Sequence, residues 1–599
     1  MIKKLFKPNI ILFTIISFII VEIGMRVFSI DNNCVLDVIC TIALTFLINY
    51  LYKNIELIKN KTSLITSSIY SFLISMVLML QSKIVFSGNV YGGKPDENYF
   101  LDFAFIDFIK VLAGFAVVFV LVLNLLIVVK KYEEKLTISD KESVRISNVK
   151  FFFICFALIA IPFTLYLLTY APGAVLGDST YQIGQALGKT TLNNHHPVVH
   201  TYFLGFFMRL GENFDNYNVG VLLHSIFQIV LISLGLAYFL LWLKKKNVRL
   251  IYLLLVYFYF VANTVFAAYS IIMWKDPLFC LAIFLISLIM FDAIKSNGVE
   301  LKKPSTIAWY IVYAFIIIFF RNNGIYIVIA STLALLIMYN KKVPWFAGIT
   351  IVFIALSIII PKAIYDKNKI TTPYKELLGI PLQQIAGTIN YSGDINEEEK
   401  EYLESITSFD NWKSLYKPMC VDVLKNSNNF KISVIENDKA KFFGTWFSLL
   451  PKNLSRYIKS YLLGTYGFWS IETKNSYGFV DTYIINNRYG IERTDYIKNL
   501  LGFSLEDVWY SKVDYLGSGT LFWIMMLSII LLINKKASKY IVIYIPAIAC
   551  FATIMLATPV AFSLRYVFMF AYMLPLFIIC PFMDLKQNKI KEKKKKWNY

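Results

Sequence analysis

Charged residues are scarce in this chain. Asp, Glu, Lys and Arg make up 16% of its 599 residues, whereas hydrophobic residues make up 57%. Because soluble domains carry about a quarter charged residues, this composition excludes an ordinary soluble enzyme. What remains is a series of long apolar runs joined by short polar loops, which is typical of an integral membrane protein. We therefore expect an all-α, multi-pass membrane protein.

Histidine and cysteine are also rare, and neither follows a metal-binding pattern. The chain has four histidines without an HExxH motif and seven cysteines without CxxC spacing. Four of the cysteines lie inside apolar runs. This distribution argues against a disulfide framework and against a cysteine-based zinc site.

The net charge of +20 comes mainly from lysines in short loops and from the C-terminal "KQNKIKEKKKKWNY". Basic residues spread over short loops follow the positive-inside rule, so they indicate a cytoplasmic face and not a nucleic-acid partner. Both termini fall on that face in the predicted topology. The basic tail is also suited to contact anionic membrane lipid.

The chain contains about fourteen apolar segments long enough to be considered as membrane spans. The first follows Lys3, Lys4 and Lys7 and lacks a small-residue cleavage site, so we expect it to be retained as a helix. The approximate cores are 8–30, 35–52, 63–87, 104–129, 150–170, 218–243, 250–270, 277–294, 306–320, 324–340, 344–361, 518–534, 540–557 and 563–583.

These segments divide the chain into five parts. The expected parts are an accessory four-helix block (1–130), a transmembrane core (150–361) whose first extracytoplasmic loop is 171–217, an extracytoplasmic domain of mixed or mainly helical structure (362–517), C-terminal transmembrane helices (518–583) and a basic cytoplasmic tail (584–599). In the domain, "GDINEEEKEYLESI" predicts a capped helix beginning near Asp394.

Asp178 is the first candidate functional residue. It follows "YAPGAVLG", whose Pro172, Gly173 and Gly177 break the helix at the end of the fifth span. A carboxylate at this membrane edge is a candidate general base for a lipid-borne substrate. Capping of the following "STYQIGQALG" helix is the simpler alternative.

Three of the four histidines follow in "NNHHPVVHTYFLG". Pro197 suits the first turn of a helix too short to span the membrane. His196 and His200 share a face of it at a spacing that can hold zinc. Hydrogen bonding of His195 and His196 to substrate, or to loop backbone, is the alternative.

Further polar residues interrupt apolar runs on the same predicted face. Lys275 and Asp276 lie in "MWKDPLF", Arg321 and Asn322 in "FFRNNGIY", and Arg565 in "FSLRY". Capping explains an aspartate before Pro277, and arginines at a membrane edge can extend to lipid headgroups. Together, however, Lys275, Arg321 and Arg565 are suited to surround an anionic group such as a lipid phosphate.

Gln383 and Gln384 in "IPLQQIA" open the extracytoplasmic domain. Their uncharged amides suit sugar hydroxyls, and a polar turn explains them equally well.

Taken in order, "APGAVLGDSTYQIGQALG", "NNHHPVVHTYFLG", "MWKDPLF", "FRNNGIY", "IPLQQIA" and "FSLRYVF" resemble an uncharacterised family of multi-pass membrane proteins of Gram-positive bacteria, over about residues 150–580. Through that family the chain is similar to distant members of the GT-C superfamily of membrane glycosyltransferases. The superfamily's catalytic aspartate lies in the first extracytoplasmic loop of its core, and Asp178 is the matching position.

This resemblance implies a GT-C-like core, a polyprenyl-phosphate-linked sugar donor, and inverting transfer on the outer face of a bacterial plasma membrane. The acceptor would be a cell-envelope glycan, lipid or protein. A DxD-type pair is missing here, so involvement of a divalent cation stays an open question. A polymerase or ligase of lipid-linked glycans and a lipid or sugar transporter are the alternatives. Transport would favour ionisable residues near mid-membrane, whereas these lie at one edge.

Overall fold

The computed structural model describes residues 10–30, 34–85, 99–136, 138, 144–471, 482–506, 508–509, 515–557 and 560–586. Within these ranges every regular element is a helix, and extended segments meet only in isolated β-bridges. The expectation of an all-helical chain is confirmed for this part of the molecule. Lys3, Lys4, Lys7 and most of the predicted basic tail (587–599) lie outside the described residues.

In the described part, nine helices are long and apolar enough to cross a membrane. They are α2 (Ile10–Val27), α3 with η1 (Cys34–Leu57), α4 (Lys61–Gln81), α5 (Phe105–Lys131), α7 (Asn148–Thr169), α10 (Tyr217–Lys245), α13 (Asp276–Lys295), α16 (Pro344–Lys367) and η5 with α27 (Ser538–Leu556). A tenth span forms if α11 (Leu250–Ala262) and α12 (Thr264–Ile271), bent by 56°, count as one.

The prediction of about fourteen spans is therefore only partly supported. The other four predicted segments are apolar helices of at most 17 residues: α14 (Pro304–Phe320), α15 (Gly324–Tyr339), α26 (Ser518–Asn534) and α28 with η7 (Met569–Phe582). At 1.5 Å per residue they fall short of a hydrocarbon core of about 30 Å. The sequence located the polar turn 321–323 between α14 and α15 correctly, but hydropathy alone does not show that a short apolar helix crosses the whole membrane.

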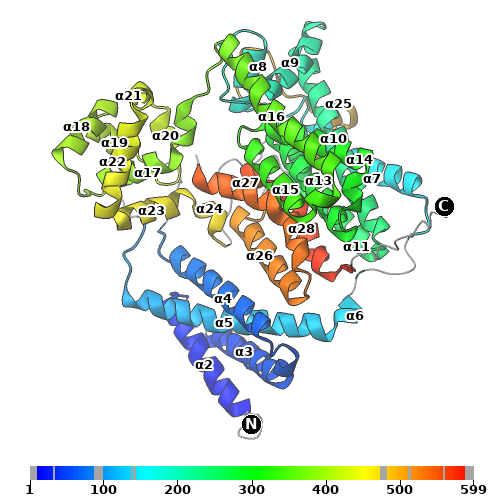
Figure 1. Cartoon of the computed structure of the whole chain (residues 1–599), viewed down its shortest axis with the longest axis vertical. Coiled ribbons are helices and arrows are strands. Elements are labelled where there is room, and N and C mark those ends of the chain that lie inside the picture. The colour runs from blue at the N-terminus through cyan, green and yellow to red at the C-terminus, as the bar shows by residue number, and fades with distance from the viewer. Residues whose placement is uncertain are drawn as a thin grey trace, which may run out of the picture.

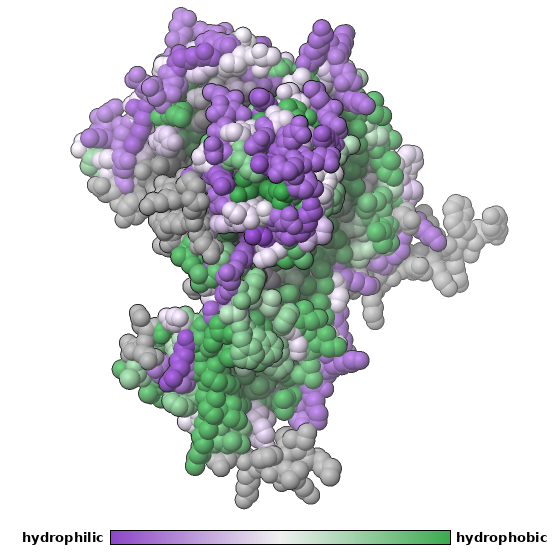
Figure 2. Space-filling model, turned by 90° about the vertical axis from the view of Figure 1, so that its left-hand side faces the viewer, coloured by the Kyte–Doolittle hydropathy of each residue, from purple (hydrophilic) through white to green (hydrophobic). Residues whose placement is uncertain are grey.

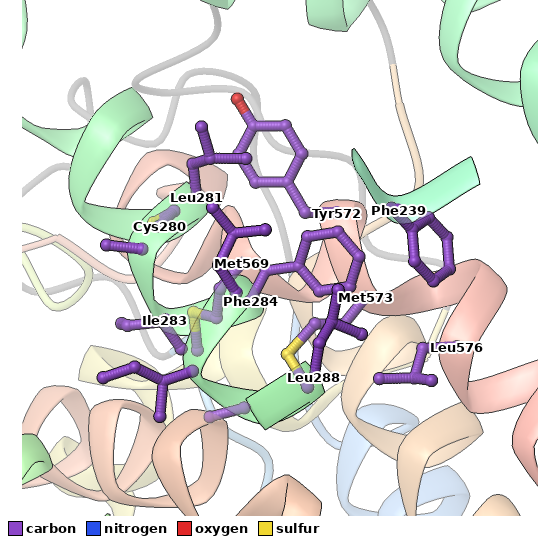
Figure 3. Close-up of a cluster of buried hydrophobic side chains, with 14 of the residues drawn as sticks. Phe239, Cys280, Leu281, Ile283, Phe284, Leu288, Met569, Tyr572, Met573 and Leu576 are labelled. Carbon is purple, nitrogen blue, oxygen red and sulfur yellow. The ribbon is translucent and has the colours of Figure 1, made fainter. Parts of the chain in front are cut away.

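Helix α13 is the centre of the transmembrane core. Its side chains are apolar on nearly every side, as expected of a helix in the protein interior. Helices α10, α14, α27 and α28 surround it and bury nearly all of its residues. The Phe284 ring lies 4.8 Å from that of Phe239 on α10 and is nearly parallel to that of Tyr572 on α28 (Figure 3). This packing anchors the N-terminal end of α13, where the predicted Lys275 and Asp276 lie.

Helices α2–α5 pack mainly on one another and form a separate layer at the bottom of Figure 1. The block contacts the core through α4 and α26, where the Tyr70 hydroxyl donates to the carbonyl of Trp523 (3.1 Å). Helices α2 and α3 bury few residues, so most of their apolar surface faces outward. Figure 2 shows this lower part of the molecule as largely hydrophobic.

The predicted extracytoplasmic domain is helical, and we call its elements between η4 and α24 the helical insert. Its core packs around Trp412, Tyr416 and Tyr457. The predicted capped helix is confirmed: it begins at Glu397, three residues after Asp394, and Asn396 and Glu399 form its capping box. The elements are η4 (Tyr374–Leu377), α17 (Gly379–Asn390), α18 (Glu397–Ile406), α19 (Phe409–Leu415), α20 (Asp422–Lys425), α21 (Ile432–Asn437), α22 (Lys439–Lys452), α23 (Leu454–Gly464) and α24 (Tyr466–Trp469).

Candidate functional site

Two backbone segments far apart in sequence lie side by side and carry the candidate site. The loop that leaves α7 pairs with the loop that enters α13 through a parallel bridge between Ala174 and Ile272. Gly173 permits this approach, because a Cβ there would lie 2.7 Å from the carbonyl oxygen of Ile271. Helix α8 (Gly177–Ala186) then begins, and the Ser179 hydroxyl donates to the carbonyl of Met273 (2.9 Å). The first turn of α8 is thereby placed beside the start of α13.

Asp178 is paired with Arg565 across 387 positions of sequence. The Arg565 Nη2 donates to Asp178 Oδ2 at 2.8 Å, and a third of the Asp178 side chain is exposed. Arg565 lies on η6 (Leu564–Val567), and its guanidinium is 4.5 Å from the centre of the Trp274 ring. The alternative of helix capping is wrong, because Leu176 occupies the N-cap position and the structure has no side-chain cap there.

Asp276 is the buried centre of a second, linked pair. Its side chain is 1% exposed, with Oδ1 2.8 Å from Arg321 Nη1 and Oδ2 3.9 Å from Arg565 Nε. The predicted capping role is again wrong, since Asp276 is the first residue of α13 and caps no backbone group through its side chain. Arg565 therefore lies between the two carboxylates and joins them into one cluster.

Lys275 is buried in the same cluster and bonds to His196, with Nζ and Nδ1 2.8 Å apart. Burial lowers the pKa of Lys275 to about 8, although Asp178 and Asp276 oppose this effect. Burial also lowers the pKa of His196 well below its ordinary value, and Lys275 adds to this shift. At neutral pH the lysine is therefore charged and the histidine is neutral.

The five charged side chains of this cluster leave one positive charge. Asp178 and Asp276 carry two negative charges, and Lys275, Arg321 and Arg565 carry three positive charges. Burial alone would raise the pKa of Asp178, but Arg565 and Lys275 outweigh it and hold that pKa well below its usual range. The cluster can therefore accept one further anionic group.

Two unpaired hydrogen-bond donors also favour the binding of an anion at this cluster. The Trp274 Nε1 and the Ser563 hydroxyl are buried and have no hydrogen-bond partner within the described part of the chain. Trp274 stacks on Arg565, and Ser563 lies two residues before it. Because buried donors are normally satisfied, unpaired donors beside a net positive charge are a feature of an anion-binding site.

The loop with the histidines is held by the segment just before the helical insert and by the insert itself. The Asn194 N–H donates to the Thr371 carbonyl at 2.8 Å. His195 Nδ1 is 3.3 Å from Glu376 Oε1, and Lys425 Nζ is 2.6 Å from Glu376 Oε2. The His195 and His196 rings are 4.4 Å apart, so this network continues to Lys275. Sequence reasoning missed Glu376, because nothing in "YKEL" distinguishes it from a surface carboxylate.

The remaining predicted residues fall into two groups. Asn322 joins the loop by donating to the Asn194 carbonyl at 3.0 Å. Gln383 and Gln384 lie in the core of the helical insert, where their amide groups donate to the carbonyls of Lys417 and Tyr457. The structure thus brings Asn322 near the histidine loop, and it places both glutamines in the packing of the insert.

The short helix predicted after the histidines is α9 (Val198–Glu212), with Pro197 at its N-cap. His200 Nδ1 is 3.1 Å from the Gln182 amide nitrogen, whereas His196 bonds to Lys275. The two rings proposed for zinc therefore have separate protein partners. In the described ranges, no group of three or more His, Cys, Asp or Glu side chains is arranged to hold a metal ion.

The helices and the charged cluster define a multi-pass membrane protein with a buried anion-binding candidate at the side that carries the helical insert. Residues 187–596 match the Family of unknown function (DUF6020), and the chain belongs to this family. Asp178 lies just before the matched range, and the other predicted site residues lie inside it. Searches of curated proteins and of solved structures return no significant match.

Proposed function

We propose that this protein is a GT-C-type glycosyltransferase that transfers a sugar from a polyprenyl-phosphate donor to a cell-envelope acceptor. The observation that carries the proposal is the cluster in which Asp178, a partly exposed carboxylate, meets Arg565 and Lys275 beside the start of α13. In this proposal the cluster lies at the outer face of a bacterial plasma membrane, both termini are cytoplasmic, and the four shorter apolar helices complete about fourteen spans.

The charge of the cluster supports this choice of donor. A sugar linked to a lipid through one phosphate is a phosphodiester with a single negative charge. The cluster has one uncompensated positive charge, together with two unpaired donors for phosphate oxygens, Trp274 Nε1 and the Ser563 hydroxyl. A donor with one phosphodiester group would thus neutralise the site.

The proposed reaction uses Asp178 as general base. As the acceptor oxygen bonds to the anomeric carbon, its proton passes to Asp178, and the bond from that carbon to the phosphate oxygen breaks with its electron pair leaving on phosphate. In the free protein Arg565 weakens Asp178 as a base by holding its pKa low. When the donor binds, Arg565 turns toward the phosphate, and Asp178 recovers the basicity it needs. Arg565, Arg321 and Lys275 then stabilise the departing anion.

A transfer assay with the reconstituted full-length protein tests the proposal. Liposomes would contain the protein, a panel of labelled polyprenyl-phosphate hexoses, and envelope glycan fractions as acceptors. We expect label to appear in a new glycosidic bond with release of polyprenyl phosphate. Repeated addition of sugars to one acceptor would favour a polymerase, and absence of any new bond with every donor would contradict the proposal.

The bent pair α11–α12 is the one observation that favours the transport alternative, because broken spans are common where transporters bind substrates. The same liposomes separate the two functions. Movement of the labelled lipid-sugar between leaflets without bond formation would support transport and exclude transfer as the main activity.

The pKa of Lys275 predicts a pH dependence of donor binding. Because this pKa is lowered to about 8, the ammonium that contacts phosphate is present below pH 8 and is lost above it. We expect the donor KM to rise roughly tenfold per pH unit above about pH 8. The guanidinium of Lys275→Arg stays charged, so this variant should remove the dependence. An equal rise of KM in both proteins would show that another group is responsible.

A further inference from the structure

The accessory block contains an apolar pocket of about 380 Å³ between α2, α3, α4 and α5. Small residues line it: Gly24 on α2, Ala43 on α3, and Ala113 and Gly114 on α5. A Cβ added at Gly24 would meet no atom within 4 Å, so the helices do not close at this point. The lining is almost entirely apolar, and the flanking helices α2 and α3 expose most of their surface. The pocket is thus accessible to lipid chains.

The pocket extends from the middle of the block toward the side of the helical insert. It is lined by Gly24 and Met25 from the last turn of α2 and by Leu78 from the last turn of α4, whereas its α5 residues, from Ala113 to Leu121, lie in the middle of that helix. The loop before α5 contacts the insert, because Asp102 forms an ion pair with Lys459 of α23. The pocket therefore belongs to the membrane leaflet on the insert side.

Two buried lysines share one aspartate close to this pocket, because Lys110 lies three residues before Ala113, the first α5 residue of the lining; we call Lys83, Asp107 and Lys110 the rim cluster. Asp107 Oδ2 is 2.8 Å from Lys83 Nζ, and Asp107 Oδ1 is 3.5 Å from Lys110 Nζ. The side chains of Lys83, Lys110 and Asp107 are 5%, 11% and 5% exposed. Lys110 also donates to the Ser82 hydroxyl at 2.9 Å. Among the described residues, this rim cluster carries one uncompensated positive charge.

The rim and the pocket are continuous along α5. Lys110 precedes Gly114 by four residues and Val117 by seven, so all three lie on one face of the helix. Helical side chains lean toward the N-terminus, which directs Lys110 away from the pocket and toward the membrane edge. An anionic group at Lys110 would therefore lie directly above a chain in the pocket.

We propose that the accessory block binds one anionic phospholipid from the leaflet on the insert side. One acyl chain occupies the apolar pocket, and the lipid phosphate compensates the excess charge at Lys110 and Lys83. An unpaired buried charge is costly, and a lipid anion relieves that cost, whereas a zwitterionic lipid brings no net negative charge. This site is independent of the glycosyltransferase proposal.

Native mass spectrometry of the purified full-length protein tests the site. The probes are phosphatidylglycerol and phosphatidylcholine with identical acyl chains. We expect one phosphatidylglycerol to be retained with at least fivefold preference. Lys110→Met should lose about fivefold in affinity, and Gly24→Leu should abolish retention by filling the pocket. Lys131→Met, an exposed lysine at the other end of α5, is the matched control and should bind like the wild type.

Several outcomes would overturn the site. Equal retention of the two lipids, or unchanged binding in Gly24→Leu, would show that the pocket does not hold an anionic lipid. A dimer that Gly24→Leu dissociates would show that a second copy fills the pocket instead. If Lys110→Met does not fold, Gly24→Leu still decides, because a Cβ at this position meets no atom within 4 Å and the rest of the leucine enters the empty pocket.

Discussion

Replacing Asp178 with asparagine is expected to lower the rate of sugar transfer by about 10²- to 10⁴-fold, the range typical of a lost general base. Asparagine has nearly the same shape as aspartate but cannot accept the acceptor proton. Arg565, which loses one carboxylate partner, keeps Asp276 within 3.9 Å, so the cluster retains one of its two links. Donor affinity should stay within a few-fold of wild type or rise, because Arg565 is freer to contact phosphate.

The measurement is single-turnover transfer in liposomes, with thermal unfolding in detergent as the check on folding. Asp410→Asn, an exposed residue of α19, is the matched control and should behave like wild type. Normal turnover by Asp178→Asn would remove the assignment of the base. Loss of donor binding together with turnover would instead assign Asp178 to substrate binding.

Replacing Asp276 with asparagine is expected to have the largest effect on stability, a loss of about 3–5 kcal/mol in the free energy of unfolding. Asp276 is 1% exposed and lies 2.8 Å from Arg321. Without its charge, the guanidinium of Arg321 remains buried against Phe279 and Tyr566 with no carboxylate beside it. A buried ion left without its partner accounts for most of this cost.

A second substitution separates charge from shape. Adding Arg321→Met to Asp276→Asn removes the unpaired cation and should recover most of the lost stability, while transfer stays low because the phosphate loses a cation. Unfolding would be followed by heat or denaturant in detergent. A loss below about 1 kcal/mol in the single variant would mean that water or lipid compensates Arg321, as at an exposed ion pair.

Local features of this fold could be predicted from the sequence, whereas contacts between distant segments could not. Pro197 and the apolar run after it predicted α9, and the structure has that helix from Val198 to Glu212. Such features depend on neighbouring residues, which the sequence displays directly. Capping roles for Asp178 and Asp276 were also local expectations, yet both carboxylates pair with arginines from distant segments.

The sequence predicted most of the charged residues of the candidate site, but it did not predict which of them form ion pairs. Asp178, Lys275, Arg321 and Arg565 stood out because charge is rare in apolar surroundings. That Arg565 joins two carboxylates depends on how η6, α8 and α13 pack. Glu376 was missed for the opposite reason, since it lies in an ordinary polar stretch and gains its role only by meeting His195.

The sequence by itself determined that this chain is a multi-pass, all-helical membrane protein, because hydrophobic transfer depends on composition summed along each segment. The tertiary structure alone decided which charges meet, because ion pairing acts over a few ångströms between residues hundreds of positions apart. It showed that Gln383 and Gln384 belong to the packing of the insert. It also gave the accessory helices a pocket with a cationic rim, which their hydropathy did not reveal.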